Sequence, residues 1–195
     1  MSNRKLVKIA EEDNGRKPRQ EGTYHRVLDA VVELLRETKY SELTVRAIAA
    51  RAEVSPATAY NYFKSKNGLI AEVYLRLVRT VPLFVDVNQT THERVTQEIH
   101  ALAMLGANEP EVAAATTTAL MGDEEELKPL REQIGTEVRR RLTAALGPGV
   151  PINVLSAVEF VFYGALVPAG TGSLGYDTVA SRIDGVIGLI LQAPH

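Results

Sequence analysis

The sequence predicts an all-α protein, in which a small three-helix domain of the helix-turn-helix type precedes a larger helical domain. Apolar residues recur at the spacing of one helix face, first at Tyr24, Val27, Leu28, Val31, Leu34 and Leu35. No stretch alternates apolar and polar residues as a half-buried strand does. Breaks that contain glycine or proline separate the later segments, so we expect about nine helices.

The helices follow one another in a regular order along the chain. The first apolar pattern begins at about residue 22 and ends near 38–40, and two short helices and a longer one follow within 44–81, where Pro82 ends the segment. Five further helices are expected at roughly 90–106, 109–121, 123–146, 152–168 and 176–192.

The composition is that of an ordinary globular protein, with 45% apolar and 24% charged residues. The absence of cysteine excludes disulfides, thiolate metal sites and cysteine nucleophiles, and it suits a cytoplasmic protein. No apolar run follows the first basic residues, so we expect no signal peptide. The most apolar stretch, roughly 150–170, contains Glu159 and Pro168, which favours a buried helix over a membrane span.

Charge is distributed unevenly along the chain. Residues 1–80 hold 15 Lys and Arg against 10 Asp and Glu, whereas the remaining residues hold 7 against 14. A basic first part suggests contact with a polyanion, although a solvated surface would look the same. We divide the chain into a polar N-terminal arm at 1–20, a helix-turn-helix domain at 21–66 and a ligand-binding and dimerisation domain at 67–195.

The most informative stretch runs from Thr44 to Lys66 and reads TVRAIAARAEVSPATAYNYFKSK. Thr44 and Ser55 are good N-caps, and Pro56 suits the first position of the helix after Ser55. That helix is only about two turns long and carries hydroxyl, amide and phenol groups. Such a helix is typical of entry into the major groove of DNA, and the alternative is a surface pair of antiparallel helices.

The same stretch resembles the signature of the TetR family of transcriptional regulators. The matching residues, in order and spacing, are Thr44, Arg46, Ala49, Ala52, Val54, Ser55, Thr58, Tyr60, Tyr62, Phe63, Ser65 and Lys66. Three positions depart from the pattern: Glu53 and Ala57 stand where glycine is usual or frequent, and Ala59 replaces a larger aliphatic residue. If φ is positive at Glu53, its side chain is strained by about 1 kcal/mol.

The resemblance implies a role in binding double-stranded operator DNA. It assigns phosphate contacts to Thr44, Tyr60, Tyr62 and Lys66, and contacts with base edges to Arg46, Pro56, Ala57, Thr58 and Asn61, with Ser55 at the start of the reading helix. A surface salt bridge for Arg46 and simple exposure for Asn61 are the alternatives. Arg16, Lys17 and Arg19 in the arm either reach the minor groove or form a tail.

The resemblance also implies a homodimer and a small-molecule effector. The last two helices of this chain, 152–168 and 176–192, would form a four-helix bundle with those of a second copy. The two reading helices of the dimer would then bind a near-palindrome. The effector would be apolar or amphipathic, would weaken DNA binding by moving the helix that starts at Ser65, and would so relieve repression. The candidate lining residues, each of which could equally be ordinary core, are Leu102, Leu105, Leu120, Met121, Leu142, Phe160 and Tyr163.

Several other patterns do not support a different function. The glycine-rich stretch 170–175 fits GxGxxG but lacks the strand and the βαβ unit of a dinucleotide site, so we interpret it as a loop. The acidic run 123–126 suits a helix start, and the four histidines lack zinc spacing. We therefore expect neither enzyme activity nor a cofactor or metal. The alternative function is a helical dimeric interaction protein without specific DNA binding.

Overall fold

Every regular element of the computed structural model is a helix within the residues that it describes, which are 18–83, 86 and 88–192. This finding confirms the all-α fold class. The elements are α1 (Pro18–Glu37), α2 (Val45–Arg51), α3 (Pro56–Tyr62), α4 (Lys66–Thr80), α5 (Thr91–Asn108), α6 (Pro110–Leu120), the 3-10 helix η1 (Glu125–Leu127), α7 (Lys128–Leu146), α8 (Ile152–Gly170) and α9 (Tyr176–Gln192).

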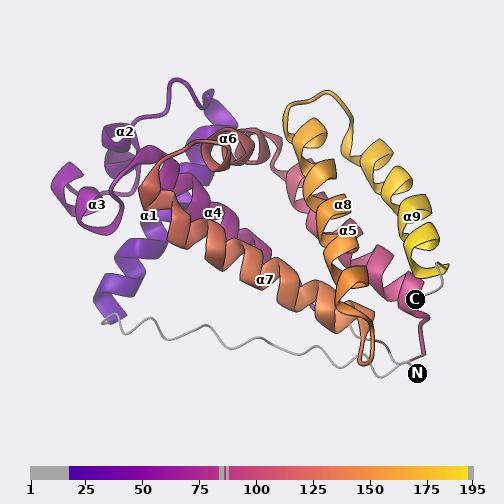
Figure 1. Cartoon of the computed structure of the whole chain (residues 1–195). Coiled ribbons are helices and arrows are strands. Elements are labelled where there is room, and N and C mark those ends of the chain that lie inside the picture. The colour runs from indigo at the N-terminus through magenta and orange to yellow at the C-terminus, as the bar shows by residue number, and fades with distance from the viewer. Residues whose placement is uncertain (1–17, 84–85, 87, 193–195) are drawn as a thin grey trace, which may run out of the picture.

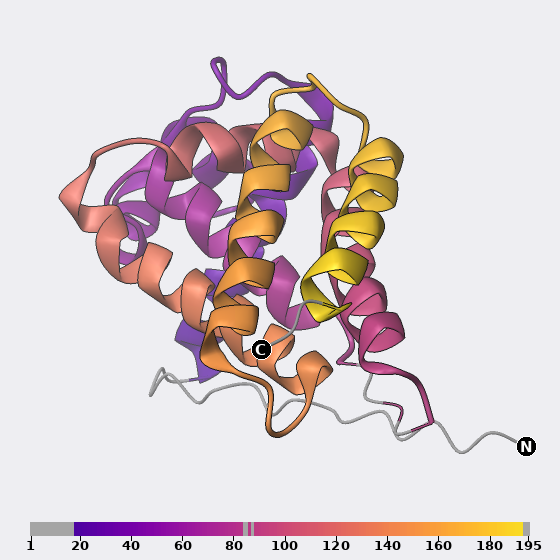
Figure 2. The same ribbon diagram turned by 45° about the vertical axis from the view of Figure 1, so that its right-hand side comes forward.

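The helices build two cores that share α4. Helices α1, α2 and α3 gather at one end of the molecule, and α8 and α9 run side by side at the other (Figures 1 and 2). Leu69 and Ile70 of α4 lie in the core of the first unit, whereas Leu75 and Val78 lie in the core of the second. Because one helix serves both cores, a shift of α4 has to involve both units.

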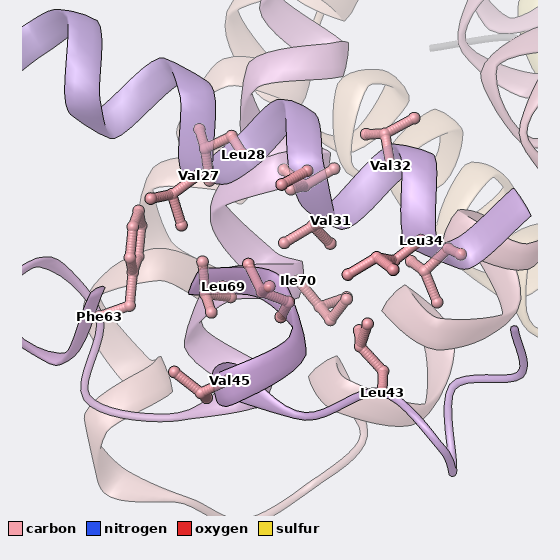
Figure 3. Packing of buried hydrophobic residues seen from close by; sticks show 14 of the residues in the cluster. Val27, Leu28, Val31, Val32, Leu34, Leu43, Val45, Phe63, Leu69 and Ile70 are labelled. Carbon is pink, nitrogen blue, oxygen red and sulfur yellow. The ribbon is translucent and has the colours of Figure 1, made fainter. Parts of the chain in front are cut away.

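The apolar face predicted for the first helix forms the centre of the first core. Val27, Leu28 and Val31 of α1 are fully buried, in one cluster with Leu69 and Ile70 (Figure 3). Full burial of a side chain of this size contributes about 1.5–3 kcal/mol relative to exposure. This cluster therefore fixes α1 against α4 and gives α2 and α3 a surface on which to pack.

Within the described residues, helix α1 extends back to Pro18, about four residues before the apolar pattern becomes visible. The helix thus includes the last three residues of the predicted arm, among them Arg19, which is exposed. Arg16 and Lys17 lie outside the described residues.

The helix expected over 123–146 is divided in two. A short 3-10 helix occupies Glu125–Leu127, and α7 begins only at Lys128. Pro129 explains the break, because its ring would clash with the carbonyl four residues earlier in a continuous α-helix. The glycine-rich stretch 170–175 starts with the last residue of α8 and otherwise connects α8 to α9, as the loop interpretation predicts.

The turn between α2 and α3 places a glutamate in the left-handed region. Glu53 has φ of 56° and is the one non-glycine residue with positive φ in the described part of the chain. The Val54 amide donates to the Ala49 carbonyl at 2.9 Å, and the Glu53 amide donates to the Ala50 carbonyl at 3.2 Å. These two bonds form a Schellman motif, which requires the left-handed conformation at Glu53. The backbone at Glu53 is therefore strained, as we expect of a non-glycine residue with positive φ.

Replacing Glu53 by glycine is expected to raise the free energy of unfolding by about 0.5–1 kcal/mol. Relief of left-handed strain, roughly 1–2 kcal/mol, outweighs the greater entropy that glycine brings to the unfolded chain. Urea denaturation measures the change, with Glu53→Ala as the control because alanine keeps the strain. A Glu53→Gly variant no more stable than Glu53→Ala would contradict this account of the turn.

A buried ion pair joins three helices of the second unit. Arg141 of α7 is fully buried, and its Nε donates to Oε1 of Glu98 on α5 at 2.5 Å. Its Nη1 donates to the Val81 carbonyl at 2.8 Å and its Nη2 to the Pro82 carbonyl at 3.1 Å. Burial raises the pKa of Glu98, an effect that the nearby Arg141 guanidinium opposes. The guanidinium thereby ties the end of α4 to α5 and α7.

The Arg141→Met variant is expected to lose about 3–5 kcal/mol of unfolding free energy, because Glu98 then remains buried without its partner. The double variant Arg141→Met, Glu98→Leu should recover part of this loss, since it removes the stranded carboxylate as well. Urea denaturation of both variants and of Glu98→Leu completes the cycle. Losses that simply add up would show that the two side chains are not coupled.

Candidate nucleic-acid interface and cavity

The two short helices of the helix-turn-helix are closed by side-chain caps. Ser55 Oγ accepts a hydrogen bond from the Thr58 amide at 3.0 Å, and Pro56 occupies the first turn of α3. Thr44 Oγ1 caps α2 by accepting from the Ala47 amide at 3.1 Å. The Ser55 and Thr58 hydroxyls also bond each other at 2.8 Å. Helices this short gain little from propensity, so the caps and the core together hold α3 in place.

Helix α3 turns one edge toward the core and leaves the others open. Ala59 is fully buried, and Phe63, which ends the helix, packs in the same core as α1. Tyr60 is 52% exposed on the outer side. Of the ten residues predicted to contact DNA, those that are exposed are Thr44, Arg46, Ser55, Pro56, Ala57, Tyr60 and Asn61, and those that are half-buried are Thr58, Tyr62 and Lys66.

The two arginines of α2 have different environments. Arg51 pairs with Glu37 of α1 at 2.6 Å and more loosely with Glu33 at 3.4 Å. Arg46 is exposed and has no hydrogen bond or ion pair with any residue that the structure describes. The surface salt bridge considered for Arg46 is therefore not formed within this part of the chain. Arg51 has a structural partner, and Arg46 keeps its full set of donors.

Two of the predicted phosphate contacts are already engaged within the fold. The Tyr62 ring packs against Tyr24, with centroids 6.4 Å apart, and against Phe63 at 6.2 Å. Lys66 Nζ donates to the Tyr40 carbonyl at 3.0 Å and lies 4.1 Å above the Tyr40 ring. Ring packing leaves a tyrosine hydroxyl accessible. Lys66, in contrast, already gives one of its donors to the Tyr40 carbonyl and has only its other donors for an anion.

A polar chain connects the start of α4 to the segment between α6 and α7. Asn67 accepts a hydrogen bond from the Tyr40 hydroxyl and donates one to Glu124. Arg131 donates to the carbonyls of Gly122 at 2.9 Å and of Glu124 at 3.1 Å. Burial, with Glu124 nearby, raises the pKa of Tyr40. Glu124 therefore holds two segments together through hydrogen bonds, whereas we expected the acidic run only to suit a helix start.

An apolar cavity of about 200 Å³ is lined by residues of α4, α5, α6, α8 and the start of α9, and it opens to the surface beside Met121. Four of the seven predicted lining residues belong to it, namely Leu102, Leu120, Met121 and Tyr163. The lining is completed by residues that the sequence does not predict, namely Tyr74, Gly106, Ala113, Thr116, Thr117, Leu166, Val167 and Tyr176. Nothing in their local sequence marks them, because the five contributing helices meet only in the folded chain.

The other three predicted lining residues lie away from this cavity. Leu142 is fully buried in the second core, and Leu105 packs against that core. Phe160 is 77% exposed. Phe160 lies two positions after the fully buried Val158, a rotation of about 200° around the helix, so Phe160 has to face away from the core.

The polar groups around the cavity are uncharged. Burial raises the pKa of Tyr74, Tyr163 and Tyr176, so their hydroxyls stay protonated at neutral pH. Across the described residues, no group of three or more His, Cys, Asp or Glu side chains is arranged to hold a metal ion. The chemistry available at the cavity is therefore apolar packing and neutral hydrogen bonding.

Helix α8 has an exposed apolar side. By length and composition it is the one helix in the described ranges suited to cross a membrane, with 28% of its most apolar window buried. This is less burial than a helix in the core of the protein would have, which is what the sequence predicts for this segment. The exposed apolar side chains of α8 and α9 are Ile152, Phe160, Tyr163, Val167, Val186 and Leu189. One or two such helices are weak evidence for a membrane protein, and a protein surface would cover this side equally well.

A helix-turn-helix with an exposed, capped reading helix, carried on an all-α domain with an apolar cavity, defines a class of DNA-binding transcriptional regulators. The family model of the bacterial regulatory proteins of the tetR family matches residues 27–73. An HTH-type transcriptional regulator of Mycobacterium tuberculosis is 50% identical over 182 residues, 92% of this chain and 85% of the relative. The chain belongs to the TetR family.

Solved structures share the fold. A TetR regulator from a Rhodococcus species superposes with a TM-score of 0.76 at 20% identity, and covers 91% of this chain and 100% of its own. FadR from Bacillus subtilis, solved in complex with stearoyl-CoA, gives a TM-score of 0.61 at 19% identity, over 88% of this chain and 100% of its own. At these identities the likeness shows the architecture alone.

Proposed function

We propose that this regulator represses transcription in the cytoplasm, binding a near-palindromic operator as a homodimer and leaving it when an effector occupies the cavity. The observation that carries the proposal is the free outer side of α2 and α3, where Arg46, Tyr60 and Asn61 are exposed. A guanidinium can bond guanine bidentately, and an amide can read adenine. Pro56, Ala57 and Thr58 would meet base edges beside them, with Ser55 at the helix start.

Positioning on the duplex would come from side chains that reach the phosphates. Thr44 and Tyr60 are exposed, and Tyr62 and Lys66 are half-buried at the same domain. Contacts of this kind set the register without reading sequence. One two-turn helix reads too few bases for a unique site, so a second copy about one DNA turn (~34 Å) away is needed.

The effector's action would pass through α4. Tyr74 of α4 and Leu120 of α6 both line the cavity, and Asn67 at the start of α4 is bonded to Glu124, just beyond α6. An effector that fits only one arrangement of these helices shifts the population toward that arrangement. A change in α4 alters the separation of the two reading helices and weakens operator binding. The stearoyl-CoA bound to FadR supports a small-molecule occupant in a domain of this architecture.

Arg46→Ala is expected to weaken binding to a specific duplex by about 5- to 150-fold, the equivalent of roughly 1–3 kcal/mol for one base contact. Arg51→Ala is the matched control on the same helix, and it should change affinity by less than about threefold because Arg51 serves Glu37. Fluorescence anisotropy with DNA upstream of the protein's own gene measures both, against a scrambled duplex at two salt concentrations.

The outcomes separate the two candidate functions. Preference for the native duplex that Arg46→Ala removes supports a sequence-specific regulator. Equal, steeply salt-dependent binding to both duplexes would show that the operator lies outside the tested DNA and that Arg46 makes no base contact with the tested duplex. A folded dimer that binds neither duplex would favour the helical interaction protein and overturn the proposal.

Phe160→Glu is expected to convert the dimer into a monomer. Phe160 is 77% exposed at the centre of the apolar side of α8, and a second copy on that side would have to bury the new carboxylate without a partner. Sedimentation velocity measures the change, and Ser41→Glu, in the turn after α1, adds the same charge elsewhere. A Phe160→Glu protein that stays dimeric and helical would show that the copies meet through another surface.

A further inference from the structure

The cavity has an open side that is bordered by apolar side chains. Tyr163 and Val167 of α8 line the cavity and are exposed. Met121, which follows α6, lines the cavity as well and is 70% exposed. We call these three side chains the mouth of the cavity. A ligand in the cavity of a single copy would keep part of its surface in water at the mouth, and the mouth itself is apolar surface that gains from burial.

The mouth continues into one exposed face of α8. At about 100° per residue, Ile152, Phe160, Tyr163 and Val167 fall within an arc of about 80° on this helix. All four are exposed, and the fully buried Val158 lies on the opposite side of the helix. Tyr163 and Val167 belong both to this face and to the cavity. Whatever covers the face of α8 therefore also covers one side of the mouth.

The exposed face of α8 is uncharged. Its remaining residue, Ser156, is half-buried. The one charged side chain of α8 is Glu159, which is paired with Arg139 of α7 at 2.8 Å. In a contact with two-fold symmetry both copies present the same face, so a charge near the axis would meet its own counterpart at a cost of several kcal/mol. A face without charge avoids this cost and suits a second copy of the same chain.

The side chains near the mouth are of types that protein interfaces favour. Aromatic residues and methionine are enriched there, and Phe160, Tyr163 and Met121 are of these types. The apolar face continues onto α9, where Leu189 is exposed. A continuous apolar face of this kind marks a contact with another protein. Because one short reading helix reads too few bases, the second copy is the partner that operator binding itself requires.

We propose that the second copy of the dimer packs its α8 face over the mouth, so that residues of both copies complete each effector cavity. This inference rests on the proposed function, in that the chain dimerises and the cavity holds the effector, and it adds that the effector site exists in full only in the dimer. A ligand in the cavity then contacts its own chain at the walls and the second copy at the mouth. Ligand and second copy each strengthen the binding of the other, because coupling between two sites is reciprocal.

Single cysteines at the mouth measure whether it is covered. The chain has no cysteine, so Met121→Cys and Val167→Cys each introduce one thiol. Its rate of reaction with 4,4′-dithiodipyridine, a neutral reagent, is compared in the dimer and in the same variant carrying Leu189→Glu. Leu189 is exposed on α9 and does not line the cavity, so its replacement separates the copies and leaves the cavity as it is. Phe160→Glu provides a second monomeric background, and sedimentation velocity confirms the state of each.

We expect both thiols to react at least about tenfold more slowly in the dimer than in either monomeric background, because access to the thiol limits the rate. Ser41→Cys, in the turn after α1, is the control and should react at the same rate in all three. Met121→Cys is the decisive position, since Met121 lies outside α8 and α9.

A dimer that protects Val167→Cys but not Met121→Cys would show that the copies pack through α8 and leave the mouth open, which would overturn the proposal. Equal rates in dimer and monomer at both positions would overturn it too. So would a dimer that survives both Leu189→Glu and Phe160→Glu, because the copies would then meet through another surface.

Operator binding distinguishes this inference from the proposed function. The same anisotropy assay follows the cysteine variants on the native duplex. Specific binding by a dimer whose Met121→Cys thiol reacts as fast as in the monomer keeps the regulator and overturns the shared cavity. A protected mouth in a dimer that binds neither duplex keeps the shared cavity and overturns the regulator.

Discussion

The buried guanidinium of Arg141 is the contact on which the arrangement of the second domain depends. It pairs with Glu98 of α5, and its position is fixed further because it also donates hydrogen bonds to the carbonyls of Val81 and Pro82 at the end of α4. A charge in the interior needs partners at hydrogen-bond distance, and moving any of these helices would strand it. Three helices are thereby fixed at one point, although an apolar core alone would allow them to slide.

Helix α4 is held at its other end by different chemistry. The Asn67 side chain is hydrogen-bonded there to Tyr40 and to Glu124. Its amide group thereby connects the helix-turn-helix to the segment before α7. Between the two ends, α4 supplies Leu69 to the first core, Leu75 to the second and Tyr74 to the cavity. One helix therefore lines the cavity and also packs in the core of the helix-turn-helix.

The cavity and the exposed side of α8 are not independent surfaces. Tyr163 and Val167 line the cavity and are also 37% and 40% exposed. A second copy packed on α8 would sit over these side chains and limit access to the cavity. Dimerisation and effector binding would then influence each other through shared residues, which is a physical basis for coupling between the two sites.

The sequence by itself determined the features that depend on neighbours along the chain. Helix periodicity and the Thr44 and Ser55 caps are local, and the structure has each of them. Only the tertiary structure decided which residues share the cavity, because it is a gap between five helices and its membership depends on their rotation. Phe160 faces outward because it lies about 200° around α8 from the buried Val158. That the Thr116 hydroxyl lacks a partner depends on the positions of the helices around it.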